Sequence, residues 1–181
     1  VIGEKNILQK EAEIKIEVTF EKHHQNKILN ALFTNHLYEE VAYEIYKTEN
    51  AHQNIGLGMI GELETPIKPK AFLQFVKDKM ECGGIRHSQF LNTEIKKVAV
   101  LGGSGSFAIK NAISAGADAF LTADLKYHQF YEAENKLLLA DIGHFESERY
   151  TKNYIVDFLK EKITNFAIIL SELNTNPVKY F

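Results

Sequence analysis

Residues 98–122, with the sequence VAVLGGSGSFAIKNAISAGADAFLT, contain the pattern that decides the fold. Residues 98–101 form a short, continuously apolar run, as is typical of a strand buried on both faces. A glycine-rich turn follows, then a helical stretch over residues 107–115 that Gly116 ends, and then a second apolar run at 119–122. A strand, a helix and a second strand in this order predict a crossover connection between parallel strands.

The same alternation continues along the chain on both sides of this stretch. Further strands are predicted at residues 137–140 and 166–170, and further helices at 70–80, 127–135 and 145–163. Alternating strands and helices favour a parallel arrangement of strands. We therefore predict an α/β fold with a mostly parallel sheet and helices on both faces.

The first 64 residues have a different pattern. Residues 12–20 alternate apolar and polar side chains, as a half-buried strand does, and residues 41–46 also have extended character. We expect these two strands to be antiparallel neighbours on either side of a helix at residues 25–36. This helix would pack through Ile28, Leu32 and Phe33. Two prolines, Pro66 and Pro69, favour extended backbone before them and mark a domain boundary near residues 64 and 65.

Composition and charge disfavour several classes of protein. The 181 residues are 45% hydrophobic and 25% charged, which is typical of a globular chain. A net charge of −3 and an isoelectric point near 6.2 disfavour nucleic-acid binding, for which a basic domain is typical. The single cysteine, Cys82, excludes an internal disulfide, so we expect a reducing compartment, the cytoplasm. No apolar run reaches the roughly 18 residues of a membrane span.

Polar side chains follow each predicted strand of the α/β region. Gly103 comes after the first strand, Asp124 after the second, His144 after the third and Ser171 after the fourth. Ligands of open α/β sheets bind beyond the carboxyl ends of the strands. We therefore expect these four residues at one edge of the sheet, where a functional site would lie.

His144 and Glu148 are the sharpest candidates for metal ligands. Their i, i+4 spacing at a helix start places both side chains on one face. Imidazole and carboxylate suit a borderline divalent ion such as Zn, Mn or Fe. The alternative is a helix-capping histidine with a glutamate in a surface ion pair. Two ligands also leave a zinc site incomplete, because zinc takes about four.

Other candidates carry weaker signals. Asp124 and His128, again spaced i, i+4, could orient a ligand or transfer a proton, although ordinary loop polarity explains them equally well. His23 and His24 are adjacent, so their side chains diverge, and no carboxylate lies at helical spacing on the same face. We interpret these two histidines as solvated. Cys82 lacks the nearby oriented base that a nucleophile needs.

The glycine turn matches a nucleotide-binding pattern only loosely. Gly103-x-Gly105-x-x-Ala108 resembles a dinucleotide fingerprint, and the backbone N–H groups of Gly103, Ser104 and Gly105 could hold an anion. However, Gly102 already ends the strand, so the match needs an extra residue. A tight turn from strand to helix is the simpler interpretation. No lysine follows at the position that a P-loop requires.

Several motifs together resemble the Nif-three-like family, whose members are often labelled GTP cyclohydrolase type 2 homologues. They are the glycine turn after residues 98–101, Asp124-Leu-Lys-Tyr-His128, Gly143-His-Phe-Glu-Ser-Glu148, and the sequence SELNTNPVKY at residues 171–180. The resemblance implies a dinuclear site for two divalent metal ions in an α/β domain. That domain would be interrupted by an inserted PII/CutA-like (ferredoxin-like) domain.

The resemblance also assigns ligands and boundaries. The family's carboxy-terminal ligands fall on His144 and Glu148, and its paired-histidine motif and aspartate belong to an amino-terminal half that is absent here. His23 and His24 are not that motif. The chain would be the carboxy-terminal half of a longer protein, with residues 1–64 as part of the inserted domain and 65–181 completing the α/β domain. Alone it would hold metal weakly or not at all, and the sheet of residues 1–64 would have an edge that is unpaired or completed by another chain.

The expected function is that of a metal-dependent hydrolase with metal-bound water as the nucleophile. His128 and Asp124 are the candidate catalytic residues. Expected partners are the missing amino-terminal half, further copies in a hexameric ring and an unidentified small molecule, with no membrane and no nucleic acid. The alternatives are a non-catalytic metal-binding ring with a regulatory or scaffold role, and a nucleotide-binding α/β protein without metal.

Overall fold

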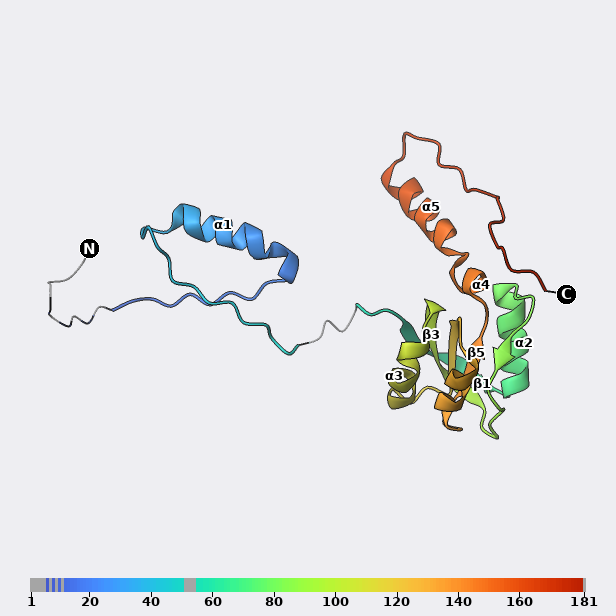
Figure 1. Cartoon of the computed structure of the whole chain (residues 1–181). Coiled ribbons are helices and arrows are strands. Elements are labelled where there is room, and N and C mark those ends of the chain that lie inside the picture. Colours follow the sequence, from blue (N-terminus) through green and yellow to red (C-terminus); the bar gives the residue numbers. More distant parts are fainter. Residues whose placement is uncertain (1–5, 7, 9, 11, 51–54, 181) are drawn as a thin grey trace. The chain divides into compact units, whose positions relative to one another are not determined.

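The computed structural model describes residues 6, 8, 10, 12–50 and 55–180 (Figure 1). The chain divides into two compact units, residues 1–50 and residues 51–181. Strand β1, Met59–Ile67, crosses the boundary expected near residue 64 and pairs within the second unit. The division between the units therefore comes before this strand.

The second unit is built on a five-stranded sheet in the order β1-β3-β4-β5-β2. The strands are β1 (Met59–Ile67), β2 (Arg86–His87), β3 (Ile95–Ser104), β4 (Ala119–Ala123) and β5 (Leu138–Asp141). The three central strands are parallel, as predicted, but β1 pairs antiparallel with β3 and β2 pairs antiparallel with β5. The α/β class is confirmed, with a mixed sheet rather than a mostly parallel one.

Helices cover both faces of this sheet (Figure 1). The helices of the second unit are α2 (Pro69–Met80), η2 (Ser106–Ala108), α3 (Ile109–Ser114), η3 (Tyr127–Ala133), α4 (His144–Glu148) and α5 (Thr151–Lys162). Phe72 of α2 packs in one apolar cluster with Leu121, whereas Ile109 of α3 packs in the other with Phe120. Because successive side chains of a strand point to opposite faces, β4 is buried along its whole length.

Residues 166–170 do not form the fourth strand that their apolar run predicted. The side chain of Ile169 is 87% exposed. An apolar run becomes a strand only where its backbone finds a partner, and the sheet continues from β5 to β2 instead. Ser171 thus follows no strand, and its carbonyl accepts a 2.7 Å hydrogen bond from Lys152 Nζ of α5.

The helix predicted at residues 145–163 is divided into α4 and α5. Between them, Arg149 forms an ion pair with Glu81 at 2.8 Å, and Tyr150 Oη donates to the Lys79 carbonyl at 3.1 Å. These contacts with the end of α2 hold the chain at the break. Among the described residues, no helix combines the length and the apolar character that crossing a bilayer requires.

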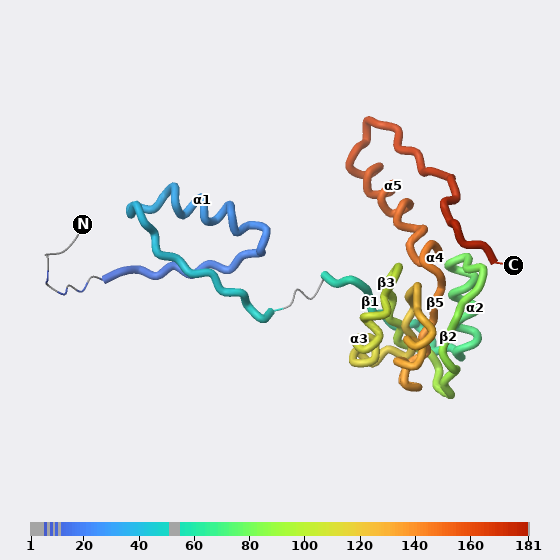
Figure 2. Tube along the Cα trace, in the orientation of Figure 1, coloured from blue at the N-terminus to red at the C-terminus, as the bar shows by residue number. Residues whose placement is uncertain are grey.

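The first unit contains the predicted helix but not the predicted strands. After the short turn η1 (Lys22–His24), α1 spans Gln25–Asn35, and Figure 2 traces the chain on either side of it. Residues 12–20 and 41–46 have no strand assignment. Ile14 in the first of these segments is 91% exposed. Two strands alone make a marginal sheet in water, so the alternating pattern needs further partners to bury its apolar side.

Helix α1 has modest packing of its own. Ile28 and Leu32 are half-buried, whereas Phe33 is exposed and its ring meets Tyr43 edge-on, with the centroids 5.6 Å apart. The predicted packing of α1 is therefore confirmed in part. Ile28 and Leu32 are partly buried, and Phe33 makes one aromatic contact.

Candidate functional site

Three predicted residues meet at the carboxyl edge of the parallel strands. His144 Nδ1 lies 2.6 Å from Asp124 Oδ2, and His144 Nε2 lies 3.3 Å from Glu148 Oε2. One imidazole is thus flanked by two carboxylates, and all three side chains are about half exposed. The common edge predicted for Gly103, Asp124 and His144 is confirmed.

The chain ends of β4 and β5 bring this trio together. Asp124 follows the last residue of β4 in a left-handed conformation, with φ +57°. Gly143 has φ +93° between β5 and α4, a conformation that favours glycine. His144 then begins α4, and one helical turn places Glu148 on the same face.

The glycine turn packs directly against α4. Gly103 has φ +66°, and a Cβ on this residue would collide with the Glu148 carboxylate. Its N–H donates to Ser147 Oγ at 2.9 Å, and its carbonyl accepts from Thr122 Oγ1 at 3.1 Å. The N–H of Gly103 is therefore already engaged within the protein, and the turn serves to seat α4 close to the sheet.

The neighbouring carboxylates change the acid–base behaviour of the imidazole. The hydrogen bond to Asp124 raises the pKa of His144 above its ordinary value, and the charges of Asp124 and Glu148 act in the same direction. Partial desolvation opposes them by favouring the neutral ring. A metal ion bound to His144 would compete with the proton that Asp124 and Glu148 favour on its ring.

A buried aspartate, to which the sequence assigned no role of its own, links the loops of the site. Asp141 ends β5 and accepts hydrogen bonds from the N–H groups of Leu125 at 2.9 Å and Gly143 at 3.1 Å. It also forms an ion pair with Arg86 of β2. Because Leu125 follows Asp124 and Gly143 precedes His144, Asp141 fixes both sides of the imidazole–carboxylate contact.

A second buried acid, Glu146, secures α4 from its other side. Its side chain is buried and accepts a 3.1 Å hydrogen bond from Asn176 Nδ2. Its carboxylate occupies the space that a Cβ on Gly143 would need. The nearby thiol of Cys82 is buried, and burial, followed by the charge of Glu146, raises its pKa to about 11. This environment agrees with the interpretation that Cys82 is not a nucleophile.

His128 lies outside this chain of contacts. Its side chain is exposed, and its ring meets Tyr127 edge-on with the centroids 5.2 Å apart. Although Asp124 and His128 are spaced i, i+4, residues 124–126 precede the helix η3, so helical spacing does not apply.

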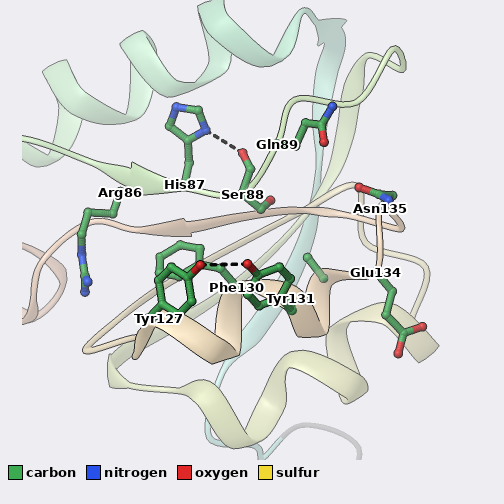
Figure 3. Close-up of a pocket in the computed structure, with 10 residues that line it drawn as sticks. Arg86, His87, Ser88, Gln89, Tyr127, Phe130, Tyr131, Glu134 and Asn135 are labelled. Atoms are coloured by element: carbon green, nitrogen blue, oxygen red, sulfur yellow. Dashed lines mark hydrogen bonds between the residues drawn. The ribbon is translucent and has the colours of Figure 1, made fainter.

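A shallow pocket of about 540 Å³ lies beside the site, between the segment at β2 and the helix η3 (Figure 3). Tyr127 and Tyr131 line it and join their hydroxyl groups at 2.9 Å. Arg86 also lines it, and its guanidinium carbon lies over the Phe130 ring, 5.6 Å from the ring centroid. The pocket contains neither His144 nor Glu148. Arg86 joins it to the loops of the site through the ion pair with Asp141 and through a 2.9 Å hydrogen bond to the Leu125 carbonyl.

Fold and site together define a class of protein, an α/β chain that gathers a histidine and two carboxylates at the carboxyl edge of its parallel strands. The profile of the Duf34/NIF3 family (NGG1p interacting factor 3) matches residues 5–177. The chain belongs to this family.

Curated relatives carry a common name. A Bacillus subtilis protein named "GTP cyclohydrolase 1 type 2 homolog" is 36% identical over 184 residues, covering 99% of this chain and 49% of the relative. A Halalkalibacterium halodurans protein of the same name is 32% identical, again over 99% of this chain and 49% of the relative. The chain therefore spans about half the length of the curated relatives it matches.

Solved structures of the family share the fold. A Bacillus cereus protein related to NIF3 matches with a TM-score of 0.66 and 32% identity, over 90% of this chain and 46% of that one. A Staphylococcus aureus protein matches with a TM-score of 0.73 and 25% identity, over 92% and 55% of the two chains.

Proposed function

We propose that this chain supplies His144 and Glu148 to a divalent-metal site of a metal-dependent hydrolase. The observation that carries the proposal is that the His144 ring contacts Asp124 through one nitrogen and Glu148 through the other. If the Nδ1–H of His144 donates to Asp124, the free electron pair lies on Nε2, the atom that faces Glu148. A histidine whose second nitrogen is held by a carboxylate is the usual form of a metal-ligating histidine.

The donor set fits a borderline ion. One imidazole nitrogen and one carboxylate oxygen approach within 3.3 Å, and Gly103 leaves the space beside Glu148 free of a side chain. Zn, Mn and Fe all accept this mixture of nitrogen and oxygen. When bound, such an ion lowers the pKa of water toward neutrality and thereby provides a nucleophile.

The other residues have supporting roles in this proposal. Asp124 orients the imidazole, and Asp141 holds the two loops that present Asp124 and His144. His128 is exposed in η3, the helix that follows the loop of Asp124, where it could exchange protons with a bound molecule.

We further propose that the site is dinuclear and takes its remaining ligands from residues that the relatives have in addition to this chain. Two ligands are too few for a stable site. The relatives are about twice as long as the matched region. Large apolar side chains such as Leu173 and Tyr154 are more than 70% exposed here, as expected if further residues cover them.

The architecture implied by the family resemblance belongs to the same proposal. The first unit, which lies within the predicted range 1–64, would be part of a PII/CutA-like inserted domain, whereas β1 belongs to the α/β domain. Copies would assemble in a hexameric ring in the cytoplasm. The exposed apolar side of residues 12–20 supports a sheet that is completed from elsewhere. Light scattering of the protein at the length of its relatives tests the ring.

The test of function combines metal analysis with a screen of hydrolysis on nucleotides. The protein at the length of its relatives should contain bound metal and should hydrolyse a substrate, and His144→Ala should abolish both. Metal that remains bound without any hydrolysis in the screen would favour a regulatory or scaffold ring. Nucleotide binding without metal would contradict the proposal.

A further inference from the structure

Three side chains of the first unit converge at the start of α1. One carboxylate oxygen of Glu21 and one ring nitrogen each of His23 and His24 lie within 4.8 Å of one another, the one such trio found among the described residues. His23 Nδ1 is 3.4 Å from Glu21 Oε2, and the two ring centroids are 3.9 Å apart. All three residues are exposed, so the histidines are solvated as predicted, but they are not divergent.

The backbone explains why helical spacing did not predict this cluster. Residues Lys22–His24 form the 3-10 turn η1, and Glu21 is the extended residue directly before it. The N–H of His24 donates to the Glu21 carbonyl at 2.8 Å, which brings these two residues together. The turn continues into the eleven residues of α1. Hydrogen bonds of the backbone therefore hold the three ligand-bearing residues together before any ion binds.

We propose that Glu21, His23 and His24 bind one divalent transition-metal ion, such as Zn²⁺, independently of His144 and Glu148. Two imidazoles and one carboxylate are a ligand set that zinc accepts, with a fourth position left for water or another donor. Mg²⁺ and Ca²⁺ prefer oxygen ligands, so two imidazole nitrogens discriminate against them. The exposure of the three side chains leaves the ion in reach of solvent.

Zinc titration of the 181-residue chain, followed through the imidazole signals in ¹H–¹⁵N NMR spectra, tests this site directly. The signals of His23 and His24 should shift together and saturate with one equivalent of zinc. His36 is a matched control, because it is an exposed histidine of the same unit. Its signal should not change at that zinc concentration, and Mg²⁺ should shift none of the three. Equal zinc shifts at His36 would overturn the proposal, because they would indicate non-specific binding.

Variants separate the contribution of each ligand. Glu21→Gln and His24→Ala should each weaken zinc binding at this site about tenfold or more, because each removes one of three ligands. His36→Ala and His144→Ala should leave it unchanged, and circular dichroism checks that α1 remains helical in every variant. Unchanged affinity in Glu21→Gln would overturn the three-ligand site. A failure of the proposed His144 site would leave the shifts of His23 and His24 intact, so the two proposals fail separately.

Discussion

At the residue scale, the central feature is the imidazole of His144, held between Asp124 on one nitrogen and Glu148 on the other. Glu148 lies on the same helix as His144, α4, whereas Asp124 directly follows the strand β4. The contact with Asp124 therefore depends on the sheet. Its effect is to fix the direction in which the second nitrogen points.

Asp124→Asn should lower the pKa of His144. The hydrogen bond to the Asp124 carboxylate is the largest cause that raises this pKa, and an amide carries no charge to hold the proton. NMR titration of the metal-free chain measures the change, with Asp157→Asn, an exposed aspartate of α5, as the control. An unchanged pKa in Asp124→Asn would contradict the assigned contact.

The same shift has a consequence for stability. A histidine pKa that is raised in the folded state stabilises the fold at pH values below the ordinary value of 6.5, and this contribution is lost as pH rises through the folded value. The contact with Asp124 should therefore add to the free energy of unfolding at pH 5.5 and not at pH 8.5. Urea denaturation at the two pH values measures this, and Asp124→Asn should lower the free energy of unfolding at pH 5.5 more than at pH 8.5.

Cys82 should react slowly with iodoacetamide in the folded chain. Its pKa of about 11 leaves roughly one thiolate per thousand thiols at pH 8, about 200-fold less than a free thiol of pKa near 8.5. The unfolded chain in urea is the control and should react at the rate of a free thiol. Equal rates in the folded and unfolded states would show that Cys82 is not buried.

Sequence reasoning identified those site residues that a local rule connects. The spacing of His144 and Glu148 places them on one helical face, and each apolar strand indicates that the polar residue after it lies at the sheet edge. Asp141 and Glu146 were not found as support for the site, because Arg86 and Asn176, their partners, are distant in sequence. The available signal for Asp141 was its position as the acid that directly follows the apolar run at residues 137–140.

At the element scale, the buried strands were predictable and the edge strands were not. β4 and β5 are short apolar runs that are buried on both faces. β1 contains Gly61 and Pro66, which read as turn residues, and its pairing with β3 shifts register between Glu62 and Ile67. β2 has only two residues, Arg86 and His87, so no periodicity can reveal it.

Residues 166–170 are the reverse case, because a strand was predicted there and none forms. Their composition is that of a buried strand, yet Phe166 and Ile169 are largely exposed and the segment has no strand partner within the described part of the chain. Local composition states which residues prefer burial, but the partner that provides it can lie outside the segment and outside this chain.

Gly103→Ala and Gly116→Ala should separate backbone strain from packing against α4. Both glycines have positive φ, +66° and +71°, so each alanine should cost about 1 kcal/mol of unfolding free energy in strain. Only Gly103 faces Glu148, whereas a Cβ on Gly116 meets nothing within 4 Å. Gly103→Ala should therefore cost more, about 2 kcal/mol or above. Equal unfolding free energies in the two variants would contradict the close packing of the turn on α4.

At the scale of the whole molecule, the chain holds one well-packed unit and much exposed apolar surface. In the second unit, β4 and β5 are buried between two apolar clusters. Outside these strands, side chains such as Ile16, Tyr154 and Leu173 are exposed. Together with the greater length of the relatives, this surface accounts for our proposal that the site and the first unit are completed by further residues.

The central claim is that His144 and Glu148 are ligands of a metal site whose other ligands lie outside this chain. Elemental analysis of bound metal after dialysis tests it, in proteins that carry His23→Ala and His24→Ala so that the cluster at η1 does not contribute. The 181-residue chain should retain almost no metal, the protein at the length of its relatives should retain a stoichiometric amount, and Glu148→Ala in the longer protein should lose it. Stoichiometric metal in the 181-residue chain, or full retention in Glu148→Ala, would contradict the account.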